Sequence, residues 1–323
     1  MLEPALSSPA TSPASEEAYA AQWRSDRLDL GAYLRRIGMS LPVLADGATL
    51  ARLHRAHIAA IPFENLDVIL GRGVSVDLPQ VEAKLVHRSR GGYCYEHATL
   101  FGAVLERVGF RVDRVLARTG DPLEHPRPRS HMVLLAARPE TGERWLADVG
   151  FGSGLLHPLA LTADGPHRQG SWIYELVRGP GGRDTAWRLG EHDGTRWTTV
   201  LTFTEEPQYP VDVEVANHNT STSPGSPFTQ RPVVVLKDQA RVRRLLGREW
   251  SVDRPGEQTA RRMLDDGEVA QVLGEVFGDA MSADEIEAVV ATLAPPERGV
   301  AGSAGSSPAQ HQTDARVAAR GQR

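Results

Sequence analysis

The amino-acid sequence predicts an α+β protein with three consecutive parts: one helical, one made of β-strands and one mixed. Apolar residues recur at helical spacing within residues 22–110 and follow a strand-like period within residues 111–215. Residues 216–295 mix the two patterns. The two ends, residues 1–21 and 296–323, are rich in small and polar residues without apolar periodicity, which predicts disordered tails.

Three helices are predicted in the first part. The second starts near Asp77, because Pro79 suits a first helical turn. The third begins near Cys94 and ends at Gly109, a residue type that favours helix ends. The three apolar faces consist of Leu50, Leu53, His57 and Ile58; of Val81, Leu85 and Val86; and of Leu100, Phe101, Val104, Leu105 and Val108.

The second part predicts short strands separated by turns rich in Gly and Pro, which is typical of a β-barrel or a β-sandwich. One such turn is 180–182, with the sequence Pro-Gly-Gly, which favours a hairpin over a phosphate-binding loop. The expected strands are 112–117, 131–137, 144–149, 172–177, 186–189 and 198–203.

The third part predicts one strand, 232–236, together with helices. Ser282 and Glu285 form a capping box at the start of a helix with apolar residues at helical spacing. Pro295 and Pro296 end that helix, since proline cannot continue it.

Composition excludes several classes of protein. With 36 basic and 41 acidic residues and a net charge of -5, the chain has no general attraction for nucleic acid or anionic membranes. The N-terminal stretch lacks the basic and apolar regions of a secretory signal, and no apolar run approaches the roughly 18 residues of a membrane span. A cytoplasmic protein is expected. A single cysteine rules out an intramolecular disulfide and a four-thiolate zinc site.

That cysteine, Cys94, is a candidate nucleophile. Gly91 and Gly92 precede it and permit a tight turn, and a helix start at Cys94 would favour an anion, here the thiolate. The alternative is a small buried thiol that only fills space. Arg90 and Glu96 either pair across the glycine turn and hold it rigid or remain two solvated charges.

A thiolate nucleophile needs an imidazole to exchange its proton and a carboxylate to orient the imidazole. His131 opens an apolar strand, and Asp148 lies in the next one, where an unpartnered carboxylate would be costly. The short turn between the strands predicts a hairpin that brings the two together. The alternative is that Asp148 only caps a turn.

Other histidines offer weaker candidates. His97 follows Cys94 by three residues on the same helical face and is a rival base, although it has no obvious orienting carboxylate. His54 and His57 are also three apart, but no Cys or acidic residue at usable spacing joins them. No metal site is therefore expected.

Four runs of residues carry these candidates in order: Ile61–Asp67, Arg90–Glu96, Ser130–Met132 and Asp148–Gly152. Together they resemble the motifs of the arylamine N-acetyltransferases, over roughly residues 25–295. The resemblance implies a helical bundle, a β-barrel and an α/β lid, with a catalytic triad akin to that of papain-like cysteine hydrolases.

The resemblance also implies a reaction and its residues. Acetyl-CoA would acylate Cys94, with His131 as base and Asp148 as its orienting group, and the acetyl group would pass to an arylamine, arylhydrazine or N-hydroxyarylamine. Coenzyme A would act as a substrate, so no permanently bound cofactor is expected, and the acceptors imply a place in xenobiotic metabolism. The implied residues are Phe63, Phe151 and Ser130 for the acceptor, Ser221, Thr222 and Ser223 for coenzyme A, and Arg90, Gly91, Gly92 and Glu96 as support for the nucleophile.

One position departs from the resemblance: Ala98 stands where many members of the family carry Asn. An amide synthase that closes a macrolactam with an acyl chain from a carrier protein is an alternative within the family. A cysteine hydrolase is a second alternative, distinguished by water as the acceptor. A binding protein that has lost its activity is a third, although all three triad residue types are intact.

Overall fold

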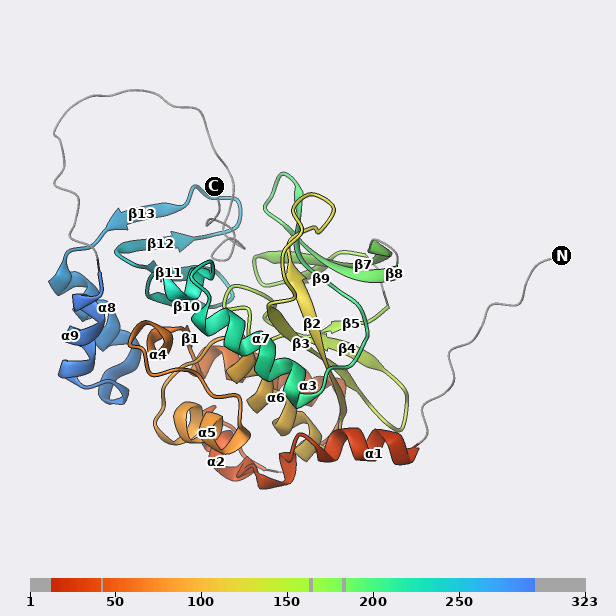
Figure 1. Cartoon of the computed structure of the whole chain (residues 1–323). Coiled ribbons are helices and arrows are strands. Elements are labelled where there is room, and N and C mark those ends of the chain that lie inside the picture. Colours follow the sequence, from red (N-terminus) through yellow and green to blue (C-terminus); the bar gives the residue numbers. More distant parts are fainter. Residues whose placement is uncertain (1–12, 42, 163–164, 182–183, 294–323) are drawn as a thin grey trace.

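The computed structural model describes residues 13–41, 43–162, 165–181 and 184–293. Within these residues the chain forms helices and two antiparallel β-sheets, one of eight strands and one of five. Figure 1 shows most helices of the first part at the bottom, the larger sheet at the upper right and the smaller sheet at the upper left.

The first part of the chain is helical, as predicted. Its elements are α1 (Pro13–Ala21), a 3₁₀ turn (Ser25–Arg27), α2 (Leu30–Arg36), α3 (Gly47–Ala60), α4 (Leu66–Ile69), α5 (Leu78–Glu82), a π-helical turn (Ala83–His87) and α6 (Cys94–Val108). The three predicted helices correspond to α3, α5 and α6. Asp77 is the N-cap of α5, and Gly109 ends α6 with a φ of 112°.

Helix α1 differs from the expected disordered tail. Residues 13–21 are helical because tertiary contacts fix them, although the local sequence has no apolar period. The Tyr19 hydroxyl donates to the carbonyl of Gln208 at 3.0 Å and accepts from the amide of Arg114 at 3.2 Å. Residues 1–12 and 294–323, and with them the predicted stop at Pro295, lie outside the described residues.

The larger sheet has the strand order β5-β4-β3-β2-β9-β8-β7-β6, with every neighbouring pair antiparallel. Its strands are β2 (Arg111–Thr119), β3 (His131–Ala137), β4 (Arg144–Ala147), β5 (Leu159–Ala160), β6 (His167–Gln169), β7 (Trp172–Gly181), β8 (Asp184–His192) and β9 (Trp197–Phe203). The six predicted strands correspond to β2, β3, β4, β7, β8 and β9. The predicted hairpin joins β7 to β8, where Gly181 pairs with Asp184; Gly182 lies outside the described residues.

The edges of this sheet nearly close into a barrel. Gln169 at the end of β6 accepts from the amides of Leu156 and His157 at 2.7 and 3.0 Å, and donates to the carbonyl of His157 at 2.9 Å. Those residues lead into β5 at the other edge. One buried side chain thus replaces the missing backbone ladder, and the sheet is barrel-like rather than a sandwich.

The smaller sheet contains a strand from the first part of the chain. Its order is β1-β10-β11-β12-β13, all antiparallel. Its strands are β1 (Phe63–Glu64), β10 (Val233–Lys237), β11 (Val242–Leu246), β12 (Glu249–Asp253) and β13 (Ala260–Met263), and the helices of the third part are α7 (Pro210–Thr222), α8 (Asp266–Phe277) and α9 (Ala283–Ala291). In β1, Phe63 pairs with Val235 and Glu64 with Val234.

The expectation of a single strand in the third part was wrong. The predicted strand is β10, and three more strands follow it. Strand β11 reads Val-Arg-Arg-Leu-Leu, so Arg243 and Arg244 interrupt its apolar alternation, and all residues of β13 are exposed. Strand β13 therefore depends on backbone pairing with β12 rather than on a side-chain pattern. The expected boundary between residues 215 and 216 falls inside α7.

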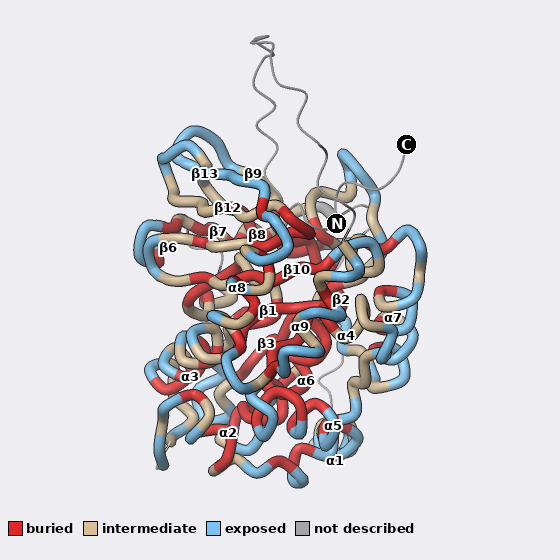
Figure 2. Tube along the Cα trace, turned by 90° about the vertical axis from the view of Figure 1, so that its left-hand side faces the viewer, coloured by how far each residue is buried: buried red, intermediate tan, exposed pale blue. Residues whose placement is uncertain are grey.

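Helix α6 lies in the centre of the larger hydrophobic core. Its residues from Cys94 to Leu105 are all buried, and Figure 2 shows buried backbone along α6, β1 and β3. A smaller core underlies α8 and α9 and includes Leu66, Val234 and Phe277. Helix α6 is thus surrounded by packed structure, which restrains its first turn.

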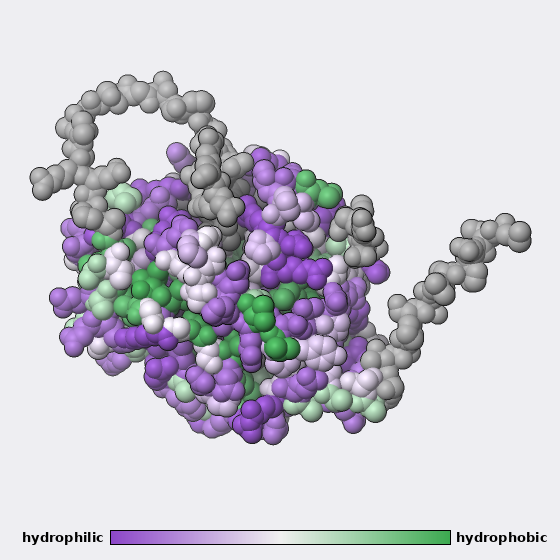
Figure 3. Space-filling view, in the orientation of Figure 1, coloured by the Kyte–Doolittle hydropathy of each residue, from purple (hydrophilic) through white to green (hydrophobic). Residues whose placement is uncertain are grey.

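The surface is mostly polar in the view of Figure 3, with apolar side chains gathered over α7. Val211 and Val215 of that helix are exposed, whereas Val213 and Thr220 are buried. Among the described residues, every helix is too short or too polar to cross a bilayer.

Candidate active site

The turn before Cys94 needs both of its glycines. A Cβ on Gly91 would lie 2.2 Å from the carbonyl oxygen of Pro62, and one on Gly92 would lie 2.7 Å from Oε2 of Glu96. The carbonyl of Gly92 accepts from the amide of Glu64 at 2.8 Å, and its amide donates to Pro62 at 3.3 Å. Bare backbone at this turn lets β1 pack directly against the residues that precede Cys94.

Cys94 is the first residue of α6 and is 3% exposed. Its Sγ lies 3.8 Å from the carbonyl oxygen of Ser130. Glu96 completes the N-terminal cap, because its Oε2 accepts from the amide of Tyr93 at 3.0 Å. The unpaired amides and the positive end of the helix dipole at this first turn favour a thiolate.

His131 and Asp148 meet across the hairpin of β3 and β4. The strands pair from Ala137 with Arg144 to Leu134 with Ala147, which places the start of β3 beside the residue that follows β4. Nε2 of His131 lies 2.8 Å from Oδ2 of Asp148, and both side chains are buried.

The second carboxylate oxygen of Asp148 also has a partner. Oδ1 accepts from the amide of Gly150 at 2.9 Å, so the carboxylate is fixed and its burial is compensated. Asp148 therefore does more than cap a turn: its carboxylate also contacts the imidazole of His131.

The charge of His131 follows from its neighbours. Burial lowers its pKa, but the charge and hydrogen bond of Asp148, together with Cys94, outweigh burial and raise the pKa to about 10. Because Nε2 is engaged by Asp148, Nδ1 is the nitrogen left to exchange a proton with Cys94. His131 can therefore be an imidazolium beside the thiol of Cys94 at neutral pH.

His97, the rival base, is committed elsewhere. Its Nδ1 lies 2.8 Å from Nε2 of His57, its Nε2 lies 3.3 Å from the carbonyl oxygen of Pro62, and the Tyr33 hydroxyl lies 2.9 Å from Nδ1 of His57. Burial lowers the pKa of His97 to about 4 and that of His57 well below its usual value, so both rings are neutral.

The hydrogen bonds that link Tyr33, His57 and His97 to the carbonyl of Pro62 can run in only one direction. A carbonyl oxygen only accepts, so His97 must donate from Nε2 to Pro62 and accept at Nδ1. His57 then donates to His97 and accepts from Tyr33. Both nitrogens of His97 are occupied, which leaves no free nitrogen for proton exchange with Cys94.

The other predicted histidine, His54, directs Nδ1 to the carbonyl of Leu156 at 3.1 Å. Across the described segments, no group of three His, Cys, Asp or Glu residues is arranged to hold a metal ion.

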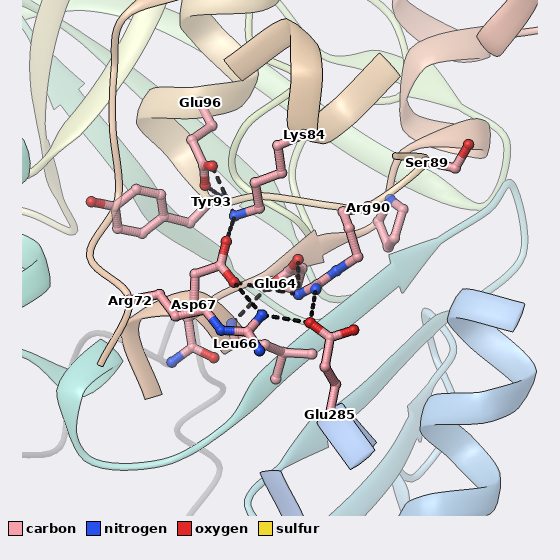
Figure 4. Close-up of polar contacts among 12 residues, drawn as sticks. Glu64, Leu66, Asp67, Arg72, Lys84, Ser89, Arg90, Tyr93, Glu96 and Glu285 are labelled. Carbon is pink, nitrogen blue, oxygen red and sulfur yellow. Dashed lines mark hydrogen bonds and ion pairs between the residues drawn. The ribbon is translucent and has the colours of Figure 1, made fainter. Parts of the chain in front are cut away.

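Arg90 and Glu96 do not pair with each other and are not solvated, which corrects both expectations. Arg90 lies 3.0 Å from Glu64, whereas Glu96 lies 2.8 Å from Lys84 (Figure 4). Lys84 also lies 2.8 Å from Asp67. We call these five side chains the buried charge cluster.

Two further residues rim the buried charge cluster. Glu285 at the start of α9 accepts from Arg72 at 2.5 Å and lies 3.7 Å from Arg90 (Figure 4). Burial raises the pKa of Glu96 to about 7, against the lowering effect of Lys84. The charge cluster thus joins the helix cap of Cys94 to the third part of the chain.

The predicted acceptor residues lie near this centre. The Phe151 ring meets the His131 ring edge to face, with centroids 5.3 Å apart. Phe63 stacks on His97 at 6.2 Å and lies 5.9 Å from Phe228. Phe228 was not identified from sequence, because it lies in a short 3₁₀ turn (Pro227–Thr229) of the third part with no helical or strand period around it.

A pocket of about 570 Å³ opens beside Cys94, between residues 125–130 and residues 219–228. Ser130 lines it, and the carbonyl of Ser130 lies 3.8 Å from Sγ of Cys94, so a single residue separates the pocket from the thiol. Arg127, which sequence analysis did not single out, also lines it.

The three residues expected at coenzyme A separate in the structure. Ser223 lines the pocket, but Ser221 and Thr222 do not. The hydroxyls of Ser221 and Thr222 donate to carbonyls one turn back in α7, at 2.9 and 2.6 Å. These two hydroxyls are satisfied within the helix.

Comparison with known proteins identifies the family. Residues 46–286 match a family model described as N-acetyltransferase. The chain is 39% identical over 259 residues to an arylamine N-acetyltransferase of Mycolicibacterium smegmatis, which covers 78% of this chain and 92% of that relative. The chain belongs to the arylamine N-acetyltransferase family.

Solved structures of the family agree with the fold. The arylamine N-acetyltransferase from Mycobacterium abscessus is similar with a TM-score of 0.79 and 38% identity, over 85% of this chain and 98% of that chain. The Mycobacterium marinum arylamine N-acetyltransferase in complex with CoA has a TM-score of 0.74 and 31% identity, over 82% of this chain and 99% of that chain. The architecture of helices, a barrel-like sheet and a further α/β part is therefore shared.

The departure at Ala98 causes no visible defect in this family member. Ala98 is 2% exposed and packs in the larger core. An apolar methyl group needs no hydrogen-bond partner there.

Proposed function

We propose that this family member transfers an acetyl group from acetyl-CoA to an arylamine, arylhydrazine or N-hydroxyarylamine through a thioester on Cys94. The observation that carries the proposal is a buried thiol at a helix start beside an imidazole whose pKa is raised to about 10. Relatives named arylamine N-acetyltransferases and a related structure with CoA support the choice of acceptor and donor.

In the first half-reaction, the thiolate of Cys94 attacks the carbonyl carbon of acetyl-CoA. A bond forms between Sγ and that carbon, and the bond to the sulfur of coenzyme A breaks. His131, as imidazolium, supplies the proton that makes the departing thiolate free coenzyme A. Asp148 holds the ring in place throughout, because it accepts at 2.8 Å from Nε2.

In the second half-reaction, the amine nitrogen attacks the thioester carbon. Neutral His131 takes the proton that the nitrogen loses, while Cys94 leaves as a thiolate. The thiolate and imidazolium are thereby restored, and protons balance over the cycle. The order resembles that of papain-like cysteine enzymes, with an amine in place of water.

The acceptor would lie among aromatic rings. Phe151 contacts the His131 ring, and the rings of Phe63 and Phe228 lie near each other. The ring of an aromatic amine can stack on these phenylalanine rings or meet them edge to face. We propose Phe63 and Phe151 as acceptor-binding residues, with Ser130 contributing its backbone beside the thiol.

The donor would enter through the pocket beside Cys94. Burial lowers the pKa of Arg127, yet the guanidinium stays charged and offers a cation to a phosphate group. Ser223, on the opposite wall, offers a hydroxyl. We assign this pocket to coenzyme A, and Arg127→Ala should raise the KM for acetyl-CoA without changing the KM for the amine.

The test is direct observation of the acyl-enzyme. Acetyl-CoA mixed with the protein in the absence of amine should add one acetyl group, visible by intact mass, and release free coenzyme A. An arylamine should discharge that group. Cys94→Ala should remain unlabelled, and Cys94→Ser serves as the matched control that keeps the size of the side chain but is a weak nucleophile.

Other outcomes assign other functions. Discharge by water as fast as by amine makes the protein a hydrolase. Labelling only by a carrier-bound acyl thioester makes it an amide synthase. Labelling without discharge by any acceptor indicates a binding protein, and no labelling from either donor overturns the covalent mechanism.

A further inference from the structure

Only two lysines, Lys84 and Lys237, occur among the 36 basic residues of this chain; the others are arginines. Both lysines are buried. Lys84 belongs to the buried charge cluster, but Lys237, at the end of β10, has no role in the two half-reactions of the proposed acetyl transfer. A buried ammonium is costly unless its hydrogens are bonded, so its surroundings show what it does.

Lys237 has three hydrogen-bond acceptors. Its Nζ donates to the carbonyls of Ser153 and Gly154 at 2.9 and 2.6 Å, and to the hydroxyl of Tyr174. It also lies 3.8 Å from the centre of the Trp172 ring, which favours a cation. Three acceptors match the three hydrogens of an ammonium group, whereas a neutral amine has only two.

The two carbonyls belong to the segment that follows Asp148 and carries Phe151. Gly152 adopts a φ of +76°, and a Cβ there would lie 3.0 Å from the Phe63 ring. A Cβ on Gly154 would lie 2.9 Å from Cβ of Phe151. The segment thus packs closely on both predicted acceptor residues, and a shift of Gly154 would move Phe151.

Lys237 anchors the end of this segment to the smaller sheet. Tyr174 assists, because its hydroxyl donates to the carbonyl of Gly154 at 3.0 Å. The other end of the segment is fixed separately, through the amide of Gly150 on Asp148. Different hydrogen bonds therefore hold Asp148 at one end of the segment and Gly154 at the other.

The charged groups around Lys237 come from neighbouring strands. Burial lowers the pKa of Lys237 to about 7; Glu191 on β8 raises it, and Arg244 on β11, which pairs with Asp253, lowers it. Burial keeps Tyr174 on β7 neutral by raising its pKa well above the usual value. The ammonium of Lys237 therefore changes charge near neutral pH.

We propose that Lys237 is a positioning residue for the acceptor: its ammonium fixes the Ser153 and Gly154 carbonyls and so holds Phe151 against His131. This inference rests on the proposed acetyl transfer and adds a residue to it. Loss of the charge should weaken acceptor binding and leave the acylation of Cys94 by acetyl-CoA intact.

The first experiment compares Lys237→Met with the wild type in the two half-reactions. Acylation of Cys94 by acetyl-CoA should keep its rate within about threefold, whereas the KM for an arylamine should rise about tenfold or more at pH 6.5, because hydrogen bonds to a charged group are lost. Lys237→Arg keeps the charge at every pH. The acceptor KM of that variant should therefore be independent of pH, while that of the wild type rises between pH 6.5 and 8.5.

The second experiment measures the titration in the wild-type protein, and variants serve only to assign its signals. Wild-type protein labelled with ¹³C at lysine Cε should give two signals, assigned by their loss in Lys237→Met and in Lys84→Arg. The Lys237 signal should titrate near neutral pH in step with the acceptor KM, and the Lys84 signal should not titrate in this range.

Failure of this inference differs from failure of the proposed function. If acetyl-CoA labels Cys94 but Lys237→Met slows acylation as much as it raises the acceptor KM, or leaves that KM unchanged, the positioning role is refuted and acetyl transfer stands. A Lys237 signal that does not titrate between pH 6 and 9 refutes the pH dependence. Absence of any acyl-enzyme in the wild type refutes acetyl transfer itself.

Discussion

Replacement of Lys84 by Met tests whether the buried charge cluster supports the nucleophile helix. Lys84 is the partner of Glu96, and Glu96 caps the amide of Tyr93 just before Cys94. Methionine has nearly the shape of lysine but no charge. The variant therefore leaves the Glu96 carboxylate with a single backbone donor in a buried site.

The magnitude follows from the contacts that remain. Asp67 keeps Arg72 and Arg90 at 3.6 and 3.8 Å and is partly exposed, so the loss falls mainly on Glu96, whose side chain is 3% exposed. Removal of one partner of a buried ion pair costs about 3–5 kcal/mol. We expect the lower end, about 3 kcal/mol at pH 8, which lowers Tm by roughly 4–5 °C in a chain of this size.

The pH dependence gives the sharper signature. Burial raises the folded-state pKa of Glu96 from 4.5 to about 7 even with Lys84 present. The folded state therefore holds more protons than the unfolded state between these values, and stability falls as pH rises through this window. Without Lys84 the window extends to higher pH, so the deficit of Lys84→Met should shrink below pH 6 and widen above pH 8.

Urea unfolding at several pH values measures the effect, with Glu96→Gln and the double variant completing a cycle. The double variant should regain about 2 kcal/mol, since a neutral amide needs no buried cation. Arg72→Met, which breaks a half-exposed pair with Glu285, is the control and should cost at most about 1 kcal/mol. A deficit below about 1 kcal/mol for Lys84→Met at pH 8, with additive effects in the cycle, would refute the reasoning.

Three further predictions concern the nucleophile turn. Because the pKa of His131 is raised to about 10, its positive charge persists across neutral pH beside Cys94, so iodoacetamide should alkylate Cys94 much faster at pH 7 in the wild type than in His131→Gln; equal rates in the two proteins would contradict this. Gly91→Ala should destabilise the protein and lower its activity because its Cβ would lie 2.2 Å from a carbonyl oxygen, whereas Gly274→Ala, with open space around it, should raise stability by about 0.5–1 kcal/mol as judged by thermal unfolding. His97→Gln should lose about 1–3 kcal/mol in urea unfolding, because it breaks a buried hydrogen-bonded chain, yet retain acylation by acetyl-CoA; the reverse pattern, with His131→Gln active and His97→Gln inactive, would make His97 the base.

Much of the fold could be predicted because its periods are local. The apolar faces of α3, α5 and α6 and the alternation in β2 and β3 are visible in the sequence, and Gly109 marks a helix end on its own. The elements that were missed depend on distant partners: α1 is fixed through Tyr19, and β13 is an exposed strand held by backbone pairing to β12. No local pattern identifies such segments.

In the candidate site, too, the residues with a local signal could be predicted and the contacts between distant residues could not. Cys94, His131 and Asp148 could be singled out because a thiol, an imidazole and a buried carboxylate have few other reasons to occur in such contexts. The pairing of Arg90 with Glu96 was wrong because both side chains find partners elsewhere, in Glu64 and Lys84. Which opposite charge a buried ion meets depends on tertiary packing and not on spacing along the chain.

The strand β1 has a consequence for the order in which the protein can become active. Asn65, directly after it, accepts from the amide of Val233 at 2.7 Å across a separation of 168 residues, and Phe63 pairs with Val235. On the ribosome, Cys94 would emerge long before either valine. Contacts of such long range form late and slowly. The nascent chain would therefore contain the Cys94 thiol before Phe63 has its partner strand. A chain truncated before β10 would lack the strand that holds Phe63, a residue proposed to bind the acceptor.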